Sequence, residues 1–308
     1  MVGAERAPVL AIAGAACIST SAVFIDLANV GPATAAFYRC AIALPVLIVL
    51  AALERRRHGR RALTMRGRAF IAGLAFAIDL VLWNHSIADV GAGVATVLGN
   101  LQVLFVAAAA WVIFKERPSR RFTVSLPVVG VGVILVAGLV GGSHFGHDPM
   151  GGIVYGVGTS IAYAAFLLVM KGASTEDGHV AGPLADATAG AALGTLALGA
   201  MFGGLQFSIG SASLFWLTLL ALLPQVVGWM LITSSLPRLP SALTSLLLLL
   251  QPALAMLLAA AVLSQYPTAW QIIGAVLVCC GVLYAARRPD ASARAVEASV
   301  PALAERAA

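Results

Sequence analysis

Two polar residues each precede a tryptophan by four positions inside long apolar segments of this chain. The pairs are Asp79 with Trp83 and Gln225 with Trp229. Residues four apart share one face of a helix, so each pair presents a hydrogen-bonding group beside an aromatic ring. Such a face suits recognition of a solute by charge, hydrogen bonding and stacking. The chain carries no constellation of nucleophile and base beside these pairs, so we predict binding and no enzymatic activity.

Other polar groups fall near the middle of further apolar segments. Polar side chains at the centre of a bilayer are destabilising and usually face the interior of a helix bundle. A rise of about 1.5 Å per helical residue places these groups near the middle of the bilayer. Packing between helices is the alternative role for each group. The predicted substrate-binding residues are Thr20, Tyr38, Arg39, Asp79, Trp83, Asn100, Gln102, Tyr163, Gln225, Trp229 and Gln251.

Arg39 is the one cation away from the ends of the predicted spans, and Asp79 lies at a comparable depth in the next span. An unpaired charge at that depth is strongly destabilising, so we predict an ion pair between the two side chains. Two sharper roles stay open. Arg39 is also suited to receive a substrate carboxylate, and Asp79 to carry a proton as the coupling ion.

The elements that position these residues are membrane helices. Hydrophobic residues make up 60% of the chain and charged residues 10%, against roughly one quarter charged in soluble domains. Mean hydropathy is +0.96. Apolar stretches of about 20 residues predict bilayer-spanning helices. Ten are predicted, over 8–28, 32–53, 67–87, 91–114, 121–141, 150–171, 183–203, 211–233, 239–263 and 268–286.

Charge placement orients the predicted spans. Lys and Arg gather in loops 54–68 and 115–121, whereas the loops on the opposite side carry none. Since basic loops stay in the cytoplasm, we expect both termini there, in a bacterial-type inner membrane. This topology accounts for the net charge of +6 without a nucleic-acid partner. Asp186 lies in the first turn of the span from 183, where we expect its carboxylate to favour the helix N-terminus.

The second half of the chain repeats the first at a register of about 149 residues. Gln102 falls on Gln251 and Gly132 on Gly281, while Asp79 and Trp83 match Gln225 and Trp229 at an offset of 146. Each copy holds five spans, an odd number, so the copies have opposite orientations and a site between them is expected. Trp83 and Trp229 would then guard opposite sides of a cavity, unless both rings anchor the chain at the lipid interface.

The repeated pattern resembles the EamA unit of the drug/metabolite transporter superfamily. Both copies carry a polar turn, an apolar helix with a midpoint glutamine, a short turn with proline and a glycine-containing helix, over 8–142 and 150–286, ahead of a cytoplasmic tail, 287–308. The first copy has Glu116 before the turn, where the second has Gln265. The resemblance implies an all-α integral membrane protein with ten helices in two inverted five-helix repeats around a central cavity.

The same resemblance implies a secondary active exporter of small metabolites, and the layout is similar to the aromatic amino-acid exporter branch. The predicted site carries little net charge beyond Arg39 and Asp79, which suits a neutral or zwitterionic solute such as an amino acid. A multidrug exporter of cationic or aromatic compounds and a non-transporting scaffold are the alternatives. We expect no cofactor and no metal, a small-molecule substrate and the lipid bilayer as partners, and either a monomer or a homodimer.

Overall fold

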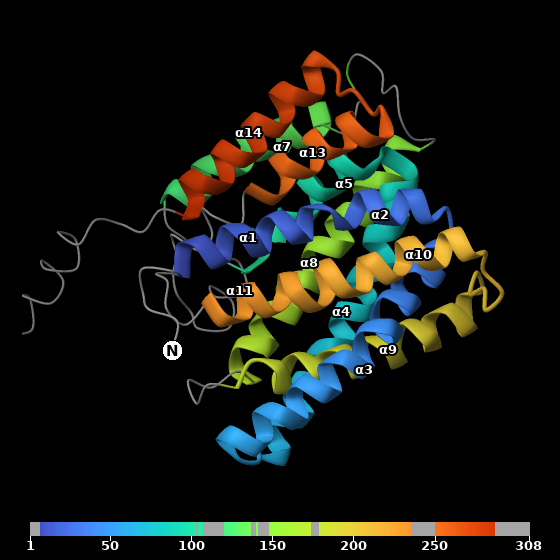
Figure 1. Cartoon of the computed structure of the whole chain (residues 1–308). Coiled ribbons are helices and arrows are strands. Elements are labelled where there is room, and N and C mark those ends of the chain that lie inside the picture. Colours follow the sequence, from blue (N-terminus) through green and yellow to red (C-terminus); the bar gives the residue numbers. More distant parts are fainter. Residues whose placement is uncertain are drawn as a thin grey trace, which may run out of the picture.

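The structure, a computed structural model, describes residues 7–102, 104–106, 120–136, 140, 148–173, 179–235 and 250–286. Within these ranges the regular structure is entirely helical (Figure 1). The helices of the first half are α1 (Ala7–Ser19), α2 (Ser21–Ala28), α3 (Pro32–His58), α4 (Leu63–Val90), α5 (Ala92–Gly99) and α7 (Arg120–Val136). Those of the second half are α8 (Pro149–Ala173), α9 (Ala181–Phe202), α10 (Ser211–Leu220), the π-helical η2 (Ala221–Gly228), α11 (Trp229–Ser235), α13 (Leu250–Leu263) and α14 (Ala269–Ala286).

The helices agree with the predicted spans. In the described part of the chain, 6 helices are long and apolar enough to cross a membrane, and shorter apolar helices occupy Ala92–Val106, Thr123–Val136, Leu250–Leu263 and Ala269–Gly281. The all-α membrane fold is therefore confirmed. Three predicted features lie wholly or partly outside the described residues. They are the turn containing Glu116, parts of the predicted spans 91–114 and 239–263, and the tail 287–308.

The most extensive helix contacts join one half of the chain to the other. α4 packs on α8 and α9, α3 on α9, α7 on α14, α5 on α13, α1 on α11 and α2 on α10. The same helix pairs recur when the two halves are exchanged. The packing of α4 on α8 corresponds to that of α11 on α1, and the packing of α4 on α9 corresponds to that of η2 on α3. The two inverted repeats are thus interleaved, with each contributing helices to the packing surface of the other.

Paired glycines let helices from the two repeats approach closely. A Cβ added at Gly73 of α4 would overlap the carbonyl oxygen of Ala187 in α9, and one at Gly190 would overlap that of Phe70. The crossing of α7 and α14 is built in the same way, from Gly132 and Gly274. Small residues at such crossings bring backbones together where no hydrophobic effect drives helices to associate.

Three predicted spans are interrupted near the centre of the bundle. The first breaks at Thr20, whose hydroxyl and amide both donate to the Cys17 carbonyl, at 2.7 and 3.3 Å. In the fourth span the hydrogen-bond pattern changes after Gly99, where the Leu101 N–H donates to the carbonyl of Leu98, three residues earlier. The eighth becomes π-helical around Pro224, which lacks an amide donor. Non-helical backbone is tolerated at membrane depth only where protein or a cavity surrounds it.

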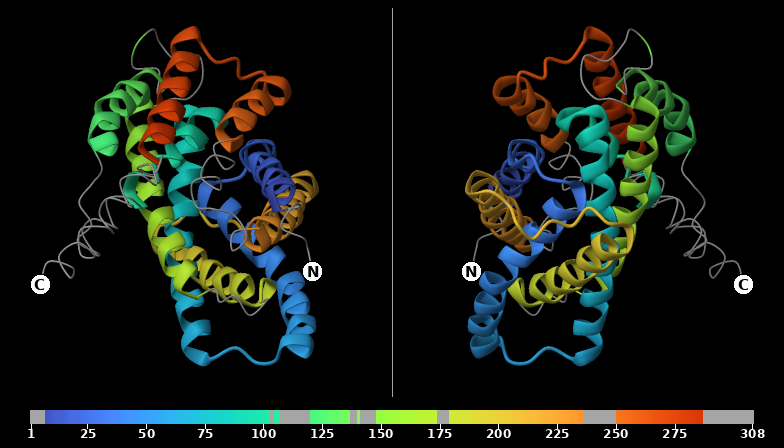
Figure 2. Two further views of the ribbon diagram at one scale, coloured as in Figure 1. Left: turned by 90° about the vertical axis from the view of Figure 1, so that its left-hand side faces the viewer. Right: turned by 90° about the vertical axis from the view of Figure 1, so that its right-hand side faces the viewer.

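The N-terminus of α9 is capped from another helix. The Glu54 carboxylate, near the end of α3, accepts hydrogen bonds from the amides of Val180, Ala181 and Gly182 at 2.6, 3.1 and 2.7 Å. Asp186, expected to serve this terminus, instead pairs with Arg61 at 2.7 Å and Arg66 at 3.4 Å. Figure 2 shows the ends of α3 and α4 extending together beyond the neighbouring helices. Asp186 therefore offsets part of the positive charge of the basic turn between them.

Replacing Gly73 with alanine should lower stability, because the new methyl group meets the α9 backbone. Overpacking of this kind costs about 1–3 kcal/mol, measured as a fall in the unfolding midpoint in detergent. Gly67→Ala is the matched control in the same helix, since a Cβ there has nothing within 4 Å. We expect the control to be neutral or stabilising by up to about 1 kcal/mol. Equal destabilisation by both changes would contradict the close crossing.

Candidate functional site

A central cavity lies where the interrupted helices converge. The cavity volume is about 70 Å³, smaller than the about 300–1,000 Å³ that is usual for sites that hold drug-sized ligands. Helices α1, α3, α4, α5, α8, α11 and α13 all contribute, so both repeats form it. The lining residues are Ile18, Ser19, Arg39, Phe76, Asp79, Leu80, Trp83, Thr96, Gly99, Asn100, Thr159, Tyr163, Trp229 and Gln251.

Most of the predicted substrate-binding residues line this cavity. They are Arg39, Asp79, Trp83, Asn100, Tyr163, Trp229 and Gln251. Trp83 and Trp229, the two tryptophans of the repeated motif, therefore face the same space, and Trp229 is only 5% exposed. This placement disagrees with the alternative in which both rings anchor the chain in lipid.

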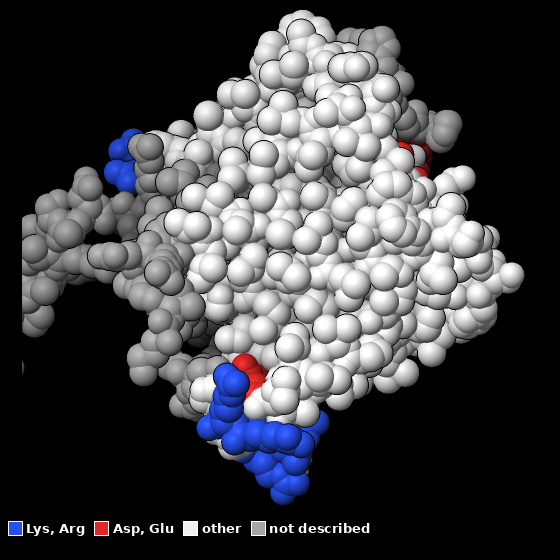
Figure 3. All heavy atoms as spheres, viewed as in Figure 1, with Lys and Arg blue, Asp and Glu red and all other residues white. Residues whose placement is uncertain are grey.

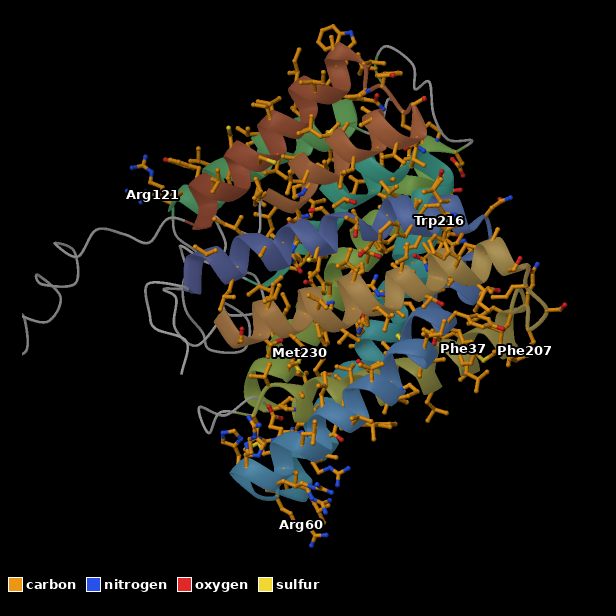
Figure 4. All side chains as sticks on the ribbon, viewed as in Figure 1. Phe37, Arg60, Arg121, Phe207, Trp216 and Met230 are labelled. Atoms are coloured by element: carbon orange, nitrogen blue, oxygen red, sulfur yellow. The ribbon has the colours of Figure 1, made fainter. Side chains whose placement is uncertain are left out.

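Four predicted residues lie elsewhere. The Tyr38 hydroxyl donates to the carbonyl of Phe207 at 3.0 Å, in the exposed region where Figure 4 shows Phe37 and Phe207 together. Thr20 is bound to Cys17 at the helix break, and its neighbour Ser19 takes the cavity position. Gln102 and Gln225 are buried but stand outside the lining residues.

Arg39 is held by the second repeat. Its side chain is 4% exposed, and its Nε donates to the Gln225 Oε1 atom at 2.7 Å. The guanidinium carbon lies 5.8 Å from the centre of the Phe76 ring, close enough for a cation–π contact. Gln225 Nε2 in turn donates to Thr188 Oγ1 at 3.4 Å. Thr188 occupies the position that matches Arg39 in the second repeat, at the offset of 149.

The predicted ion pair between Arg39 and Asp79 is not formed. Both side chains line the cavity, but within the described ranges the ion pairs within 4.0 Å are those of Asp186 with Arg61 and Arg66. The physical reason is the π-helical segment around Pro224, which places Gln225 against the guanidinium. Asp79 therefore keeps its carboxylate available to the cavity, although the residue is only 6% exposed.

Aromatic rings form one wall of the cavity. Phe76 and Phe166 stack with centroids 4.7 Å apart, and the Trp229 ring meets them edge-on at 5.8 and 5.5 Å. Tyr163 stacks on Phe166 at 5.9 Å and lies 6.1 Å from Trp229. Contacts of this geometry stabilise the wall beyond simple burial. The rings give the cavity a rigid apolar face beside its charged groups.

Two buried donors at this site have no hydrogen-bond partner in the described structure. They are Trp229 Nε1 and Gln251 Nε2, both on cavity-lining residues. A buried donor without a partner is destabilising by about 1–3 kcal/mol unless water or a ligand binds it. The cavity is therefore equipped to receive a solute that brings hydrogen-bond acceptors to these two donors.

Depth alone did not identify all of the lining residues. Phe76 precedes Asp79 by three positions and Trp83 by seven, so the helical spacing places it on their face. Thr159 was also missed, and its hydroxyl donates to the Asp79 carbonyl at 3.0 Å. No signal in the sequence pointed to Thr159, since small hydroxyl residues recur throughout these spans.

Comparison with known proteins agrees with the fold. A model of the EamA-like transporter family matches residues 6–138 and 150–287. No curated protein matches the sequence significantly. One solved structure, described only as the crystal structure of a protein, has a TM-score of 0.61 at 15% sequence identity, covering 91% of this chain and 96% of that chain. At this identity the likeness concerns the fold alone.

Gln225→Leu should destabilise the protein by about 2 kcal/mol or more, because it leaves a buried, charged Nε–H without an acceptor. Thr188→Val, which removes only the longer 3.4 Å contact of the same glutamine, should cost about 0.5–1 kcal/mol. Thermal unfolding of the purified variants in detergent measures the difference. Similar effects from both changes would mean that Gln225 does not hold Arg39.

Proposed function

The chain belongs to the EamA-like transporter family, and from this premise we propose that it exports a small zwitterionic solute, such as an amino acid, by alternating access through the central cavity. The family makes it a membrane transporter; the substrate class, direction and mechanism are the proposal. Export rests on the resemblance to the drug/metabolite transporter superfamily.

The observation that carries the substrate class is the pairing of opposite chemistries in one cavity. The Asp79 carboxylate, which has no hydrogen bond with a described residue, offers an acceptor for an ammonium group. Arg39 supplies a cation, and the unpaired donors of Trp229 and Gln251 supply neutral N–H groups for a carboxylate. The aromatic wall adds a surface for an apolar side chain. An amino acid presents all three features.

A cationic or aromatic drug is the rival substrate. The available Asp79 carboxylate beside the Trp83 and Trp229 rings favours it, because organic cations bind aromatic faces and buried carboxylates. Such a compound, however, has no anionic group to bind Arg39 and the two unpaired donors. A scaffold that does not transport would have no use for the cavity.

The interleaved repeats suggest how access would alternate. Transporters built from inverted repeats rock one helix bundle against the other around a fixed central site. Here the interruptions at Thr20, Gly99 and Pro224 lie in helices from both repeats. We infer that these segments take up the backbone adjustments of the motion, while the glycine crossings keep α4 packed on α9.

The basic end of the molecule should face the cytoplasm. The arginines of the α3–α4 connection form a cluster at one end in Figure 3, whereas most of the visible face is uncharged. In Figure 4, Arg60 marks this end and Phe207 lies far from it. With the native cysteines replaced by serine, Gln206→Cys should react with an impermeant maleimide in intact spheroplasts, and Arg60→Cys only after permeabilisation. The reverse labelling would invert the orientation.

Solute counterflow in proteoliposomes tests the proposed substrate. Amino acids should exchange saturably, and quaternary ammonium compounds should not compete. Trp229→Phe keeps the ring but removes the free Nε1 donor, so the KM for an amino acid should rise about tenfold, the usual effect of losing a hydrogen bond to a charged group. The matched control is Trp216→Phe, because Trp216 stacks on Phe24 at 5.8 Å and does not line the cavity.

The corresponding amine, which lacks the carboxylate, distinguishes the two substrate classes. If the carboxylate meets Trp229, the amine should be transported poorly and the Trp229→Phe change should leave its KM unaltered. Strong exchange of organic cations with no exchange of amino acids would overturn the proposal in favour of the drug exporter. No saturable exchange of either class would contradict both.

A further inference from the structure

A second pocket lies far from the central cavity, between the ends of α3, α4 and α9. The pocket volume is about 490 Å³, and its polar lining comprises Arg55, Arg60, Arg61, Arg66, His179 and Asp186. Four arginines thus face one carboxylate. Figure 4 places Arg60 at the tip of this end, and Figure 3 shows the basic atoms gathered there. The pocket carries a strong excess of positive charge.

Two buried nitrogen atoms in this pocket lack a hydrogen-bond partner among the described residues. Arg61 donates through Nη1 to Asp186 at 2.7 Å, yet its buried Nη2 has no hydrogen bond, although the side chain is only 10% exposed. His179 is 9% exposed, and its Nδ1 atom is likewise unpaired. The local carboxylates are occupied elsewhere, with Glu54 binding the α9 amides and Asp186 bridging two arginines. An anionic oxygen from a ligand would give Arg61 Nη2 the acceptor that it lacks.

The pocket has an apolar side as well as a charged one. Ile48 and Leu63 line it and are 54% and 80% exposed. Helix α3 has 27 residues, whereas about 20 suffice to cross the hydrocarbon core. If α3 enters the core near Pro32, its last two turns reach the headgroup layer, and Ile48 stays near the acyl chains. The site therefore joins both regions of a lipid leaflet.

We propose that this pocket binds an anionic phospholipid, with the phosphate among Arg55, Arg60, Arg61 and His179 and the acyl chains along Ile48. Basic pockets between membrane helices are suited to anionic headgroups. Because the pocket is lined by α3 and α4 of the first repeat and α9 of the second, the lipid would tie the two repeats together at one end. This role is independent of the transported solute.

The test is lipid-dependent stabilisation of the purified full-length protein in detergent. Short-chain phosphatidylglycerol should raise the melting temperature, and phosphatidylcholine should not. The Arg55→Gln/Arg60→Gln variant should raise the half-saturating concentration of phosphatidylglycerol at least tenfold, since each basic residue contributes appreciably near an anionic headgroup. Both side chains are exposed and form no hydrogen bond with a described residue, so the fold should survive.

The matched control is Arg56→Gln/Arg57→Gln. It removes the same charge from the same turn, but neither residue lines the pocket. The control should keep the wild-type response to phosphatidylglycerol. Equal weakening in both double variants, or no effect on the wild type, would overturn the proposal. Full stabilisation by inorganic phosphate at the same concentrations would also overturn it, because the ligand would then be a free anion.

Discussion

A guanidinium buried among apolar helices is the constraint on which the centre of this molecule depends. Arg39 cannot stay charged at that depth without acceptors, and the hydrogen bond from its Nε to Gln225 joins the first repeat to the second. Gln225 reaches it from a π-helical segment around Pro224, and the Phe76 ring shields the other side. The cavity, the π-helical segment and the aromatic wall all adjoin this guanidinium.

The two repeats pack their helices symmetrically but carry different charged residues. Helix pairs recur under exchange of the halves, and paired glycines set the distances between helices. The charges do not recur: Thr188 matches Arg39, and Gln225 matches Asp79. A symmetric frame favours two related conformations, whereas unequal charges make those conformations differ in energy with solute bound. Any directionality of the proposed transport would arise from that difference.

The sequence predicted the depth of a side chain in the membrane better than the neighbour that the side chain faces. Hydropathy predicted the helices, distance along each helix predicted Asp79 and Asn100 for the cavity, and the repeated spacing after Gln225 predicted Trp229. Distance along the helix also gave Gln102, which lies outside the lining residues, because residue counting fixes the height of a side chain but not the neighbour it faces. The partner of Arg39 was also missed. A π-helical turn moves Gln225 relative to a regular helix, and only tertiary packing reveals that shift.

The interleaving of the repeats has a consequence for how the chain is made. Arg39 precedes its acceptor Gln225 by 186 residues, so during synthesis it enters the membrane well before that partner has been translated. The surface of α4 that packs on α8 and α9 is likewise incomplete at that stage. The native packing of the first half is therefore completed only after the second half has been translated and inserted.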